Sequence, residues 1–381
     1  MAQTKTDYGL IYNTDGSVCT TVRPDQTPFV GVNSFAVETA TTNYVTINNY
    51  WLKAYDGTLN ATPIEYKGKS ALKVEVEAIG GTSRPRIIFR SPITIHTDEI
   101  YAISCYIENN NRVITTTDIE INMGLEDGSG LQNITPISIS NNRVVTIKPI
   151  LEQYAGNTNC TMLVVFATVG TYYVYYPQLE KKPFASSFTV GSRPRGRLVI
   201  PVEDLKFNIA NDDWVISYWK YPVATHDDTQ NGYNTCSLGR PSKGYILWGK
   251  HININKYRLY IVLNDATEIR NISNNTFNPT DYFYHWHYEV MKKQGKVLSY
   301  YVDGVKQIEY TIPADKELQT PFDVGLSLGG YIWSNTFLPN NALIANVGNG
   351  KLKPGEFTDE HIMAIYEANR AFAQKGGVKI Y

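Results

Sequence analysis

The sequence predicts an all-β protein of two tandem antiparallel jelly-roll or β-sandwich domains, with an N-terminal arm and one C-terminal helix. Three observations support this fold class. The chain contains 28 Tyr but only 19% charged residues, and tyrosine is enriched in strands. Short segments with an apolar residue at every second position recur between polar turns. Only one segment, near the C-terminus, repeats its apolar residues at helical spacing.

The segment 31–190 is predicted to form the first jelly roll. Residues 70–78 alternate apolar side chains with Lys and Glu, which is typical of a strand with one buried face. Residues 162–168 are almost continuously apolar, which indicates a buried strand. Turns rich in Asn, Gly and Ser separate these from further predicted strands, which lie at 86–90, 101–107, 119–125 and 144–150. Such regular spacing favours a sandwich or jelly roll.

A break in the strand pattern divides the chain. Residues 172–176 are predicted to form a strand, but Pro177 and Pro183 follow it and lack the backbone donors that a continuing sheet needs. Gly and Pro then mark a second break before a new apolar strand at 198–202. The sequence therefore predicts an arm, a first jelly roll and a second jelly roll at 1–30, 31–190 and 191–381.

The arm alternates short apolar pieces with Gly, Asp and Pro. This pattern predicts one or two short strands rather than a domain. Two placements stay open, because such an arm can pack on a neighbouring subunit or lie at the edge of the first jelly roll.

The second jelly roll carries the strongest local hairpin signal. Asp303-Gly304 joins the apolar strands 297–302 and 305–310, and such a pair favours a tight two-residue turn. The helix is predicted at 358–374, where Thr358 is the N-cap and two acidic residues occupy the first turn.

Composition and charge exclude several classes of protein. The formal net charge is −1, so the chain lacks the basic footprint of a nucleic-acid-binding protein. No stretch is apolar enough to insert into a membrane, and no signal peptide is recognised, so we expect synthesis and folding in a cytoplasm. The cysteines form no Cys-x-x-Cys pattern and are expected to be small buried residues, with a Cys105–Cys160 disulfide as an alternative.

The sequence contains no recognised catalytic motif, and we expect a protein that is not an enzyme. His285 and His287 lie two apart on a predicted strand, so both point to one face as a metal pair could. No third ligand is identified, so we expect no resident metal or cofactor. A Ca²⁺ site near Asp303 stays an open alternative, although Asp-Gly is first a turn signal.

The second half resembles the laminin-G-like, concanavalin-A-like jelly-roll domains. The resemblance covers about 197–372 and rests on several short motifs in order along the chain. The family's Trp-His and Tyr-Val-Asp-Gly hairpin is matched at 285–288 and 300–304, and its closing strand and terminal helix are matched at 327–330, 344–347 and 357–366.

The first half is similar to carbohydrate-binding-module jelly rolls of phage and prophage particle proteins. The residues that carry this similarity are at 33–35, 70–74, 100–107 and 176–180. The tandem resembles a phage tail-fibre, baseplate or head-decoration protein. The resemblance implies a virion protein made in the host cytoplasm, with other particle proteins and further copies of itself as partners and a host-surface glycan or protein as ligand.

Glycan binding in such folds needs exposed aromatic rings that stack on sugars, with polar groups nearby to bond the hydroxyls. We expect this site in loop-like stretches of the second jelly roll, where aromatic residues are flanked by Gly, Asn or Ser. The candidates are Tyr233, Tyr245, Trp248, Tyr331, Trp333 and Asn335. The alternatives are a purely structural capsid decoration or tail connector without a glycan ligand, and a glycan-processing enzyme, for which the paired carboxylates are missing.

Overall fold

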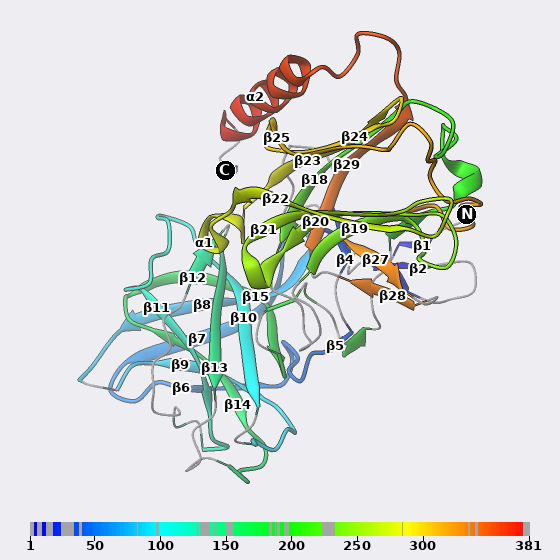
Figure 1. Cartoon of the computed structure of the whole chain (residues 1–381). Coiled ribbons are helices and arrows are strands. Elements are labelled where there is room, and N and C mark those ends of the chain that lie inside the picture. Colours follow the sequence, from blue (N-terminus) through cyan, green and yellow to red (C-terminus); the bar gives the residue numbers. More distant parts are fainter. Residues whose placement is uncertain are drawn as a thin grey trace. The chain divides into compact units, whose positions relative to one another are not determined.

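The computed structural model (Figure 1) describes residues 4–5, 10–12, 18–23, 34–37, 40–81, 83–96, 99–127, 129, 138–140, 142–149, 155–182, 185–186, 188, 191–193, 198–222, 233–283, 285–333, 336–339 and 342–375. The chain divides into two compact units. Residues Ala40–Arg193 form the inserted unit, and Met1–Thr39 together with Pro194–Tyr381 form the terminal unit. The described residues are mostly in antiparallel strands, which confirms the predicted all-β class.

The inserted unit is a β-sandwich. A six-stranded sheet in the order β12-β13-β10-β15-β8-β7 and a four-stranded sheet in the order β11-β14-β9-β6 supply its core, and β5 and β16 form a separate pair. Core residues such as Ile103 and Val174 come from the first sheet, and Phe89 and Met162 come from the second. The strands are β5 (Thr41–Thr42), β6 (Tyr50–Lys53), β7 (Thr58–Tyr66), β8 (Lys69–Ala78), β9 (Arg86–Arg90), β10 (Ile100–Asn109), β11 (Ile119–Gly124), β12 (Ser138–Ser140), β13 (Arg143–Pro149), β14 (Thr161–Phe166), β15 (Gly170–Glu180) and β16 (Ser192–Arg193).

The predicted strand periodicities are confirmed in this unit. In β8, Leu72 and Val74 are buried, whereas the intervening Lys73 is partly exposed. Every residue of β14 is buried, because its even-numbered side chains enter the main core and its odd-numbered ones pack with Ile88 on the other face. The buried thiols of Cys105 and Cys160 are free, so the alternative disulfide is wrong.

The terminal unit is also built from two large antiparallel sheets. Their orders are β1-β2-β3-β4-β29-β18-β23-β24-β25 and β17-β26-β19-β20-β21-β22, and a β27-β28 pair accompanies them. Trp214 and Ile216 from the first sheet meet Leu259 and Ile261 from the second in one core. Its strands and helices are β1 (Thr4–Lys5), β2 (Leu10–Tyr12), β3 (Val18–Arg23), β4 (Ser34–Val37), β17 (Leu198–Ile200), β18 (Trp214–Pro222), β19 (Tyr233–Gly239), β20 (Tyr245–His251), β21 (Lys256–Val262), β22 (Glu268–Thr276), α1 (Pro279–Tyr282), β23 (His287–Gln294), β24 (Val297–Val302), β25 (Val305–Thr311), β26 (Leu326–Leu328), β27 (Gly330–Trp333), β28 (Thr336–Pro339), β29 (Ala342–Lys351) and α2 (Asp359–Lys375).

The N-terminal strands lie in the terminal unit rather than at the edge of the first jelly roll. Strand β4, which falls inside the predicted first jelly roll, pairs antiparallel with β29 near the end of the chain. Strands β3, β2 and β1 continue that sheet outward in turn. The inserted unit therefore begins at Ala40, not at residue 31, because β4 pairs with β3 and β29 of the terminal unit rather than with the strands that follow it.

The predicted hairpin and helix are both present (Figure 1, β24, β25 and the red helix α2). Asp303 and Gly304 both have positive φ, 52° and 80°, as a tight two-residue hairpin turn requires. Helix α2 lies on the outer face of the nine-stranded sheet, where Ile362 and Tyr366 pack with Trp219. No helix in the described part of the chain is long and apolar enough to cross a membrane.

Candidate functional site

Two of the predicted ligand-contacting residues are buried, so that part of the prediction is wrong. Trp248 has no exposed surface, lies in the main core of the terminal unit and donates from Nε1 to the Tyr218 hydroxyl at 3.0 Å. Tyr245 is also completely buried and packs with Leu247 and Tyr260. Both belong to β20, which is paired on both sides by β19 and β21. The neighbouring glycines that suggested a loop are part of this central strand and its preceding turn.

The other predicted residues are not brought into one described site. Tyr331 is partly buried in β27 and packs against the Tyr245 cluster. Tyr233 and Trp333 contribute backbone to β19 and β27, but their side chains lie outside the described residues, as does the whole of Asn335.

Of the two histidines, His287 braces the Asp303 turn, whereas His285 Nδ1 lies 3.0 Å from the Phe283 carbonyl oxygen. His287 is 3% exposed, with Nδ1 at 2.6 Å from Asp303 Oδ2 and Nε2 at 3.0 Å from the Tyr282 carbonyl oxygen. The other Asp303 oxygen accepts from the Tyr288 backbone N–H at 2.9 Å. Both Asp303 oxygens are thus turned to protein groups rather than to a cation. Among the described residues, no three His, Cys, Asp or Glu side chains gather as a metal site.

A polar cleft of about 460 Å³ lies between the start of α2 and strands β23 to β25. Three of its charged residues are paired with one another, because Lys306 Nζ lies 2.9 Å from Asp359 and 2.8 Å from Glu309. Tyr301 donates to Asp359 at 2.6 Å, and Lys292 donates to the Phe357 carbonyl at 3.0 Å. These contacts hold the helix on the sheet, and no aromatic side chain is among the lining residues.

The outer face of the six-stranded sheet in the inserted unit has a different character, because tyrosines cover it. Neighbouring inward-facing residues such as Tyr172 and Val174 enter the core, which turns Tyr173 and Tyr175 outward. Antiparallel pairing places Tyr175 opposite Tyr106 and Tyr173 opposite Glu108. We call this surface the tyrosine face; its members are Tyr66, Tyr106, Tyr173, Tyr175 and Tyr176.

Ring contacts connect the tyrosine face into a continuous aromatic layer. Tyr66 and Tyr173 are stacked with centroids 4.0 Å apart, and Tyr106 and Tyr175 are stacked at 5.3 Å. Tyr176 lies edge-on to Tyr175 at 5.4 Å. Tyr106 and Tyr175 are buried beneath, whereas Tyr66, Tyr173 and Tyr176 keep part of their surface exposed. The exposed rings therefore rest on a fixed aromatic base.

Polar groups surround the stacked Tyr66–Tyr173 pair. Glu108 accepts from the hydroxyls of Tyr66 at 3.0 Å and Tyr175 at 2.7 Å, and from Lys67 Nζ at 2.5 Å. Partial burial works to raise the pKa of Glu108, but these donors outweigh it and hold that pKa below its usual value.

Two further polar groups lie beside the stacked tyrosines. Asn110 donates from its amide to the Tyr173 hydroxyl at 3.0 Å. The Lys73–Glu75 ion pair, at 2.6 Å, lies on the neighbouring strand β8, where Lys73 is opposite Tyr173 in the sheet register. Aromatic surface with amide, ammonium and carboxylate groups beside it can stack on an apolar ring face and bond hydroxyl groups.

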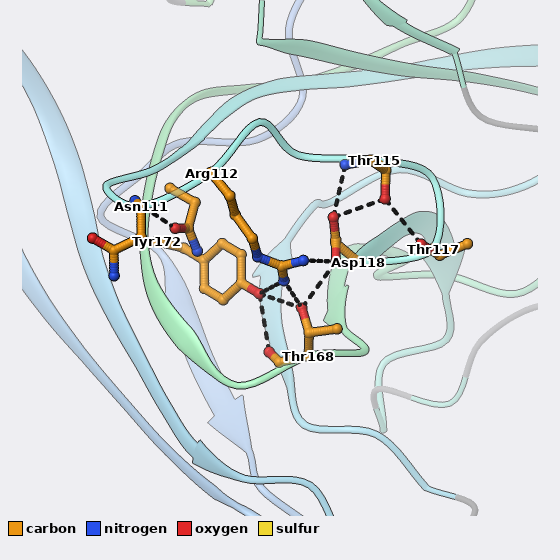
Figure 2. Close-up of polar contacts among 8 residues, drawn as sticks. Asn111, Arg112, Thr115, Thr117, Asp118, Thr168 and Tyr172 are labelled. Atoms are coloured by element: carbon orange, nitrogen blue, oxygen red, sulfur yellow. Dashed lines mark hydrogen bonds and ion pairs between the residues drawn. The ribbon is translucent and has the colours of Figure 1, made fainter.

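At one end of the same unit, a polar network surrounds the buried carboxylate of Asp118 (Figure 2). It fixes the loop after β10, to which Asn110 also belongs. Arg112 lies 2.7 Å from Asp118 and donates to the Thr168 hydroxyl at 2.5 Å. Thr115 donates to Asp118 from both its N–H and its hydroxyl, each at 2.8 Å. Tyr172 Oη lies 2.6 Å from Thr168 Oγ1. The network therefore joins the loop after β10 to the turn before β15.

We expect Asp118→Ala to destabilise this end of the inserted unit by about 1–3 kcal/mol, since it removes a buried carboxylate that accepts hydrogen bonds from the N–H and the hydroxyl of Thr115. Burial works to raise the pKa of Asp118, but the Thr115 donors and Arg112 outweigh it and lower that pKa. The wild-type contribution is therefore present at neutral pH and lost as the pH falls through the lowered pKa.

Amide hydrogen exchange measures this effect: the Thr115 N–H should exchange faster in Asp118→Ala than in the wild type. Asp127→Ala is the matched control, because the Asp127 carboxylate accepts from the N–H and the hydroxyl of Ser129 in its own turn. Equal exchange rates of the Thr115 N–H in Asp118→Ala and Asp127→Ala would show that the Asp118 network does not hold the loop.

Polar residues at the end of β15, the closing strand of the inserted unit, form buried hydrogen bonds within the unit. The Glu180 carboxylate is fully buried and accepts from Thr41 Oγ1 at 2.5 Å, Gln178 Nε2 at 2.6 Å and Ser186 N–H at 2.9 Å. The Asn43 side-chain amide donates to the Pro177 carbonyl oxygen and accepts from the Leu179 N–H on the same strand. Residues 178–180, Gln-Leu-Glu in sequence, thus join the first and last segments of the unit through hydrogen bonds.

Comparison with known proteins assigns no family. No protein-family model matches the chain, and no curated protein matches it. Among solved structures, the receptor-binding domain of botulinum neurotoxin type G shares 14% identity at a TM-score of 0.29, over 45% of this chain and 46% of that one. A heptameric SAP-like pentraxin from Limulus polyphemus shares 10% at 0.27, over 41% and 70% of the two chains.

A Caenorhabditis elegans galectin shares 13% identity at a TM-score of 0.26, over 41% of this chain and 92% of the galectin. The matched part of this chain spans less than half of the neurotoxin binding domains, 46% and 40% in two of them. By their titles, these neighbours are receptor-binding, pentraxin and galectin structures. At such identities and TM-scores the likeness carries no conclusion about the ligand of this chain.

Proposed function

We propose that this protein is a non-enzymatic carbohydrate-binding protein and that the tyrosine face of the inserted unit holds the sugar. The observation that carries the proposal is the partly exposed Tyr66–Tyr173 stack, which combines ring surface with the fixed polar groups of Glu108, Lys67 and Asn110. Pyranose sugars have an apolar face that suits such a ring and hydroxyl groups that suit such partners.

The preorganised base of the tyrosine face supports this assignment. Tyr106 and Tyr175 are buried and stacked, and Lys69 Nζ lies over the Tyr175 ring at 4.8 Å from its centroid. A ligand would therefore order few side chains on binding, which reduces the entropic cost. The aromatic residues first expected to bind sugar in the terminal unit supply no comparable surface among the described side chains.

We further propose the setting that the tandem resembles, a structural and adhesive protein of a phage particle. In that setting the chain assembles with other particle proteins and with copies of itself, and presents a sugar-binding surface to the host cell. Mass spectrometry of purified virions tests the location: peptides of this chain should appear in stoichiometric amounts, and their absence would overturn the virion assignment.

Glycan-array binding by the purified protein tests the ligand class. We expect binding to at least one host-surface glycan and an affinity loss of about tenfold, or ~1.4 kcal/mol, for Tyr173→Ala. Tyr55→Ala is the matched control, because Tyr55 is 38% exposed in the turn after β6, where Lys53 and Arg86 lie over its ring. No binding by the parent protein to any glycan would overturn carbohydrate binding and favour a purely structural decoration or connector. Equal losses in both variants would overturn the assignment to the tyrosine face.

A further inference from the structure

The core of the terminal unit contains a lysine and a glutamate with no exposed surface. Lys220 of β18 and Glu289 of β23 are both 0% exposed, and Lys220 Nζ lies 3.8 Å from Glu289 Oε2. In the antiparallel register Tyr218 is opposite Glu289 and Lys220 is opposite His287, so the two charged side chains are diagonal neighbours on one face. Taking two such charges out of water costs several kcal/mol for each ion.

The Glu289 carboxylate is only partly satisfied at this position. A charge-assisted N–H···O bond is normally about 2.7–2.9 Å long, and 3.8 Å is well beyond that. Glu289 Oε2 accepts from the Tyr218 hydroxyl at 2.7 Å. No donor among the described residues reaches the buried Glu289 Oε1. An unsatisfied buried carboxylate oxygen is costly, so the arrangement needs a different explanation.

We propose that Lys220 and Glu289 condense to an isopeptide bond that joins β18 to β23. The Lys220 ammonium first passes a proton to the Glu289 carboxylate, which gives the amine that can attack and the acid that can lose water. The Nζ lone pair attacks Cδ, the Cδ–Oε1 bond breaks, and Oε1 leaves with two protons as water. The products are one amide and one water molecule. Both buried charges disappear, and no oxidant, reductant or co-substrate is required.

The neighbouring side chains match the roles that this condensation needs. Tyr218 donates to Oε2, the oxygen that is retained in the amide and that gains negative charge in the tetrahedral intermediate. Trp248 Nε1 holds the Tyr218 hydroxyl at 3.0 Å. Burial raises the pKa of Tyr218 well above its ordinary value, so this phenol stays a donor. Oε1, which accepts no hydrogen bond from the described residues, is the oxygen that departs.

A second buried lysine, Lys250, belongs to the same polar cluster. Lys250 of β20 is 1% exposed, and the nearby Lys220 charge acts to lower the pKa of Lys250. The amide, once formed, lies among Trp248, Tyr218 and Tyr300 in a core closed to water, which protects it from hydrolysis. Because the linked positions are far apart in sequence, the bond would also constrain the unfolded chain as a disulfide does.

Intact mass spectrometry of the denatured full-length protein tests the proposal. We expect a mass lower than the sequence mass by one water molecule. Trypsin does not cleave after an acylated lysine, so a digest should contain a branched peptide that joins the segments around Lys220 and Glu289. A full sequence mass, together with linear peptides cut after Lys220, would overturn the proposal.

Variants give a second measurement that does not depend on glycan binding. The double variant Lys220→Met with Glu289→Leu removes both reacting groups and should show its own full sequence mass. The Lys306–Glu309 pair, at 2.8 Å but on the surface, is the internal control and should give linear peptides in both proteins. A water loss that persists in the double variant would place the linkage elsewhere and overturn the assignment to Lys220 and Glu289. If this variant does not fold, the mass and digest of the wild-type protein decide alone.

Discussion

Trp248→Ala should destabilise the terminal unit by about 3–5 kcal/mol, the usual cost of truncating a fully buried large aromatic residue. Trp248 has no exposed surface and packs between the two sheets with Leu259 and Tyr300. The substitution also removes the Nε1 donor that holds the Tyr218 hydroxyl. The cavity cannot close easily, because the surrounding strands are hydrogen-bonded on both sides.

Urea denaturation followed by tryptophan fluorescence measures this loss, because five of the six Trp belong to the terminal unit. Trp51→Ala is the control, since Trp51 is only partly buried and belongs to the inserted unit; it should leave the terminal-unit transition unchanged. Sugar binding should survive in Trp248→Ala below its unfolding midpoint. A stable Trp248→Ala protein that has lost sugar binding would restore Trp248 as a ligand contact and contradict its place in the core.

Local sequence patterns predicted the strands well because alternation is a local property. The pattern in β8 and the Asp303-Gly304 turn each depend on residues within one hairpin. The sequence did not predict that β4 pairs with β29, because strand pairing at that separation depends on which edge the folded sheet leaves open. For the same reason the predicted boundary at residue 31 missed the start of the inserted unit at Ala40.

The candidate site was harder to predict because burial is not a local property. Gly and Ser beside Trp248 suggested an exposed loop, whereas partners on both sides bury that strand. The tyrosine face was visible in the sequence only as one tyrosine-rich strand at 172–176. Its significance depends on register, which brings Tyr106 opposite Tyr175 and Glu108 opposite Tyr173, and on the stacking of Tyr66 from β7. A count of tyrosines contains no information about such pairings.

The buried polar cluster of the terminal unit predicts an unusual pH dependence of stability. Burial lowers the pKa of Lys250 to about 7, although Glu289 and Asp303 act in the opposite direction. Lys250 Nζ lies over the Tyr282 ring, 3.2 Å from its centroid, a cation–π contact that replaces only part of the lost hydration. In the unfolded chain the same lysine has an ordinary pKa near 10.5.

The sign of the effect follows from proton counting. Between pH 7 and 10.5 the unfolded chain binds a proton at Lys250 that the folded chain does not, so the free energy of unfolding rises with pH in that window. The penalty of burying the ammonium is complete below pH 7 and absent above pH 10.5. At about 1.4 kcal/mol for each tenfold change in proton activity, Lys250 should contribute a gain of about 2–3 kcal/mol between pH 7 and 9. Burial also raises the pKa of Tyr218, Tyr282 and Tyr300 well above 10, which opposes the gain only at higher pH.

Lys250→Met isolates this contribution, because the tyrosines are common to both proteins. Urea denaturation at pH 7, 8 and 9 should give a rising free energy of unfolding for the wild type relative to Lys250→Met. Lys243→Met, at an exposed lysine in the turn before β20, should keep the wild-type slope. The amide proposed between Lys220 and Glu289 would not reverse the sign, since removing the Glu289 charge removes an attraction that favours a protonated Lys250. Parallel curves for the wild type and Lys250→Met would mean that Lys250 keeps its charge in the folded core over this pH range, which would contradict the lowered pKa.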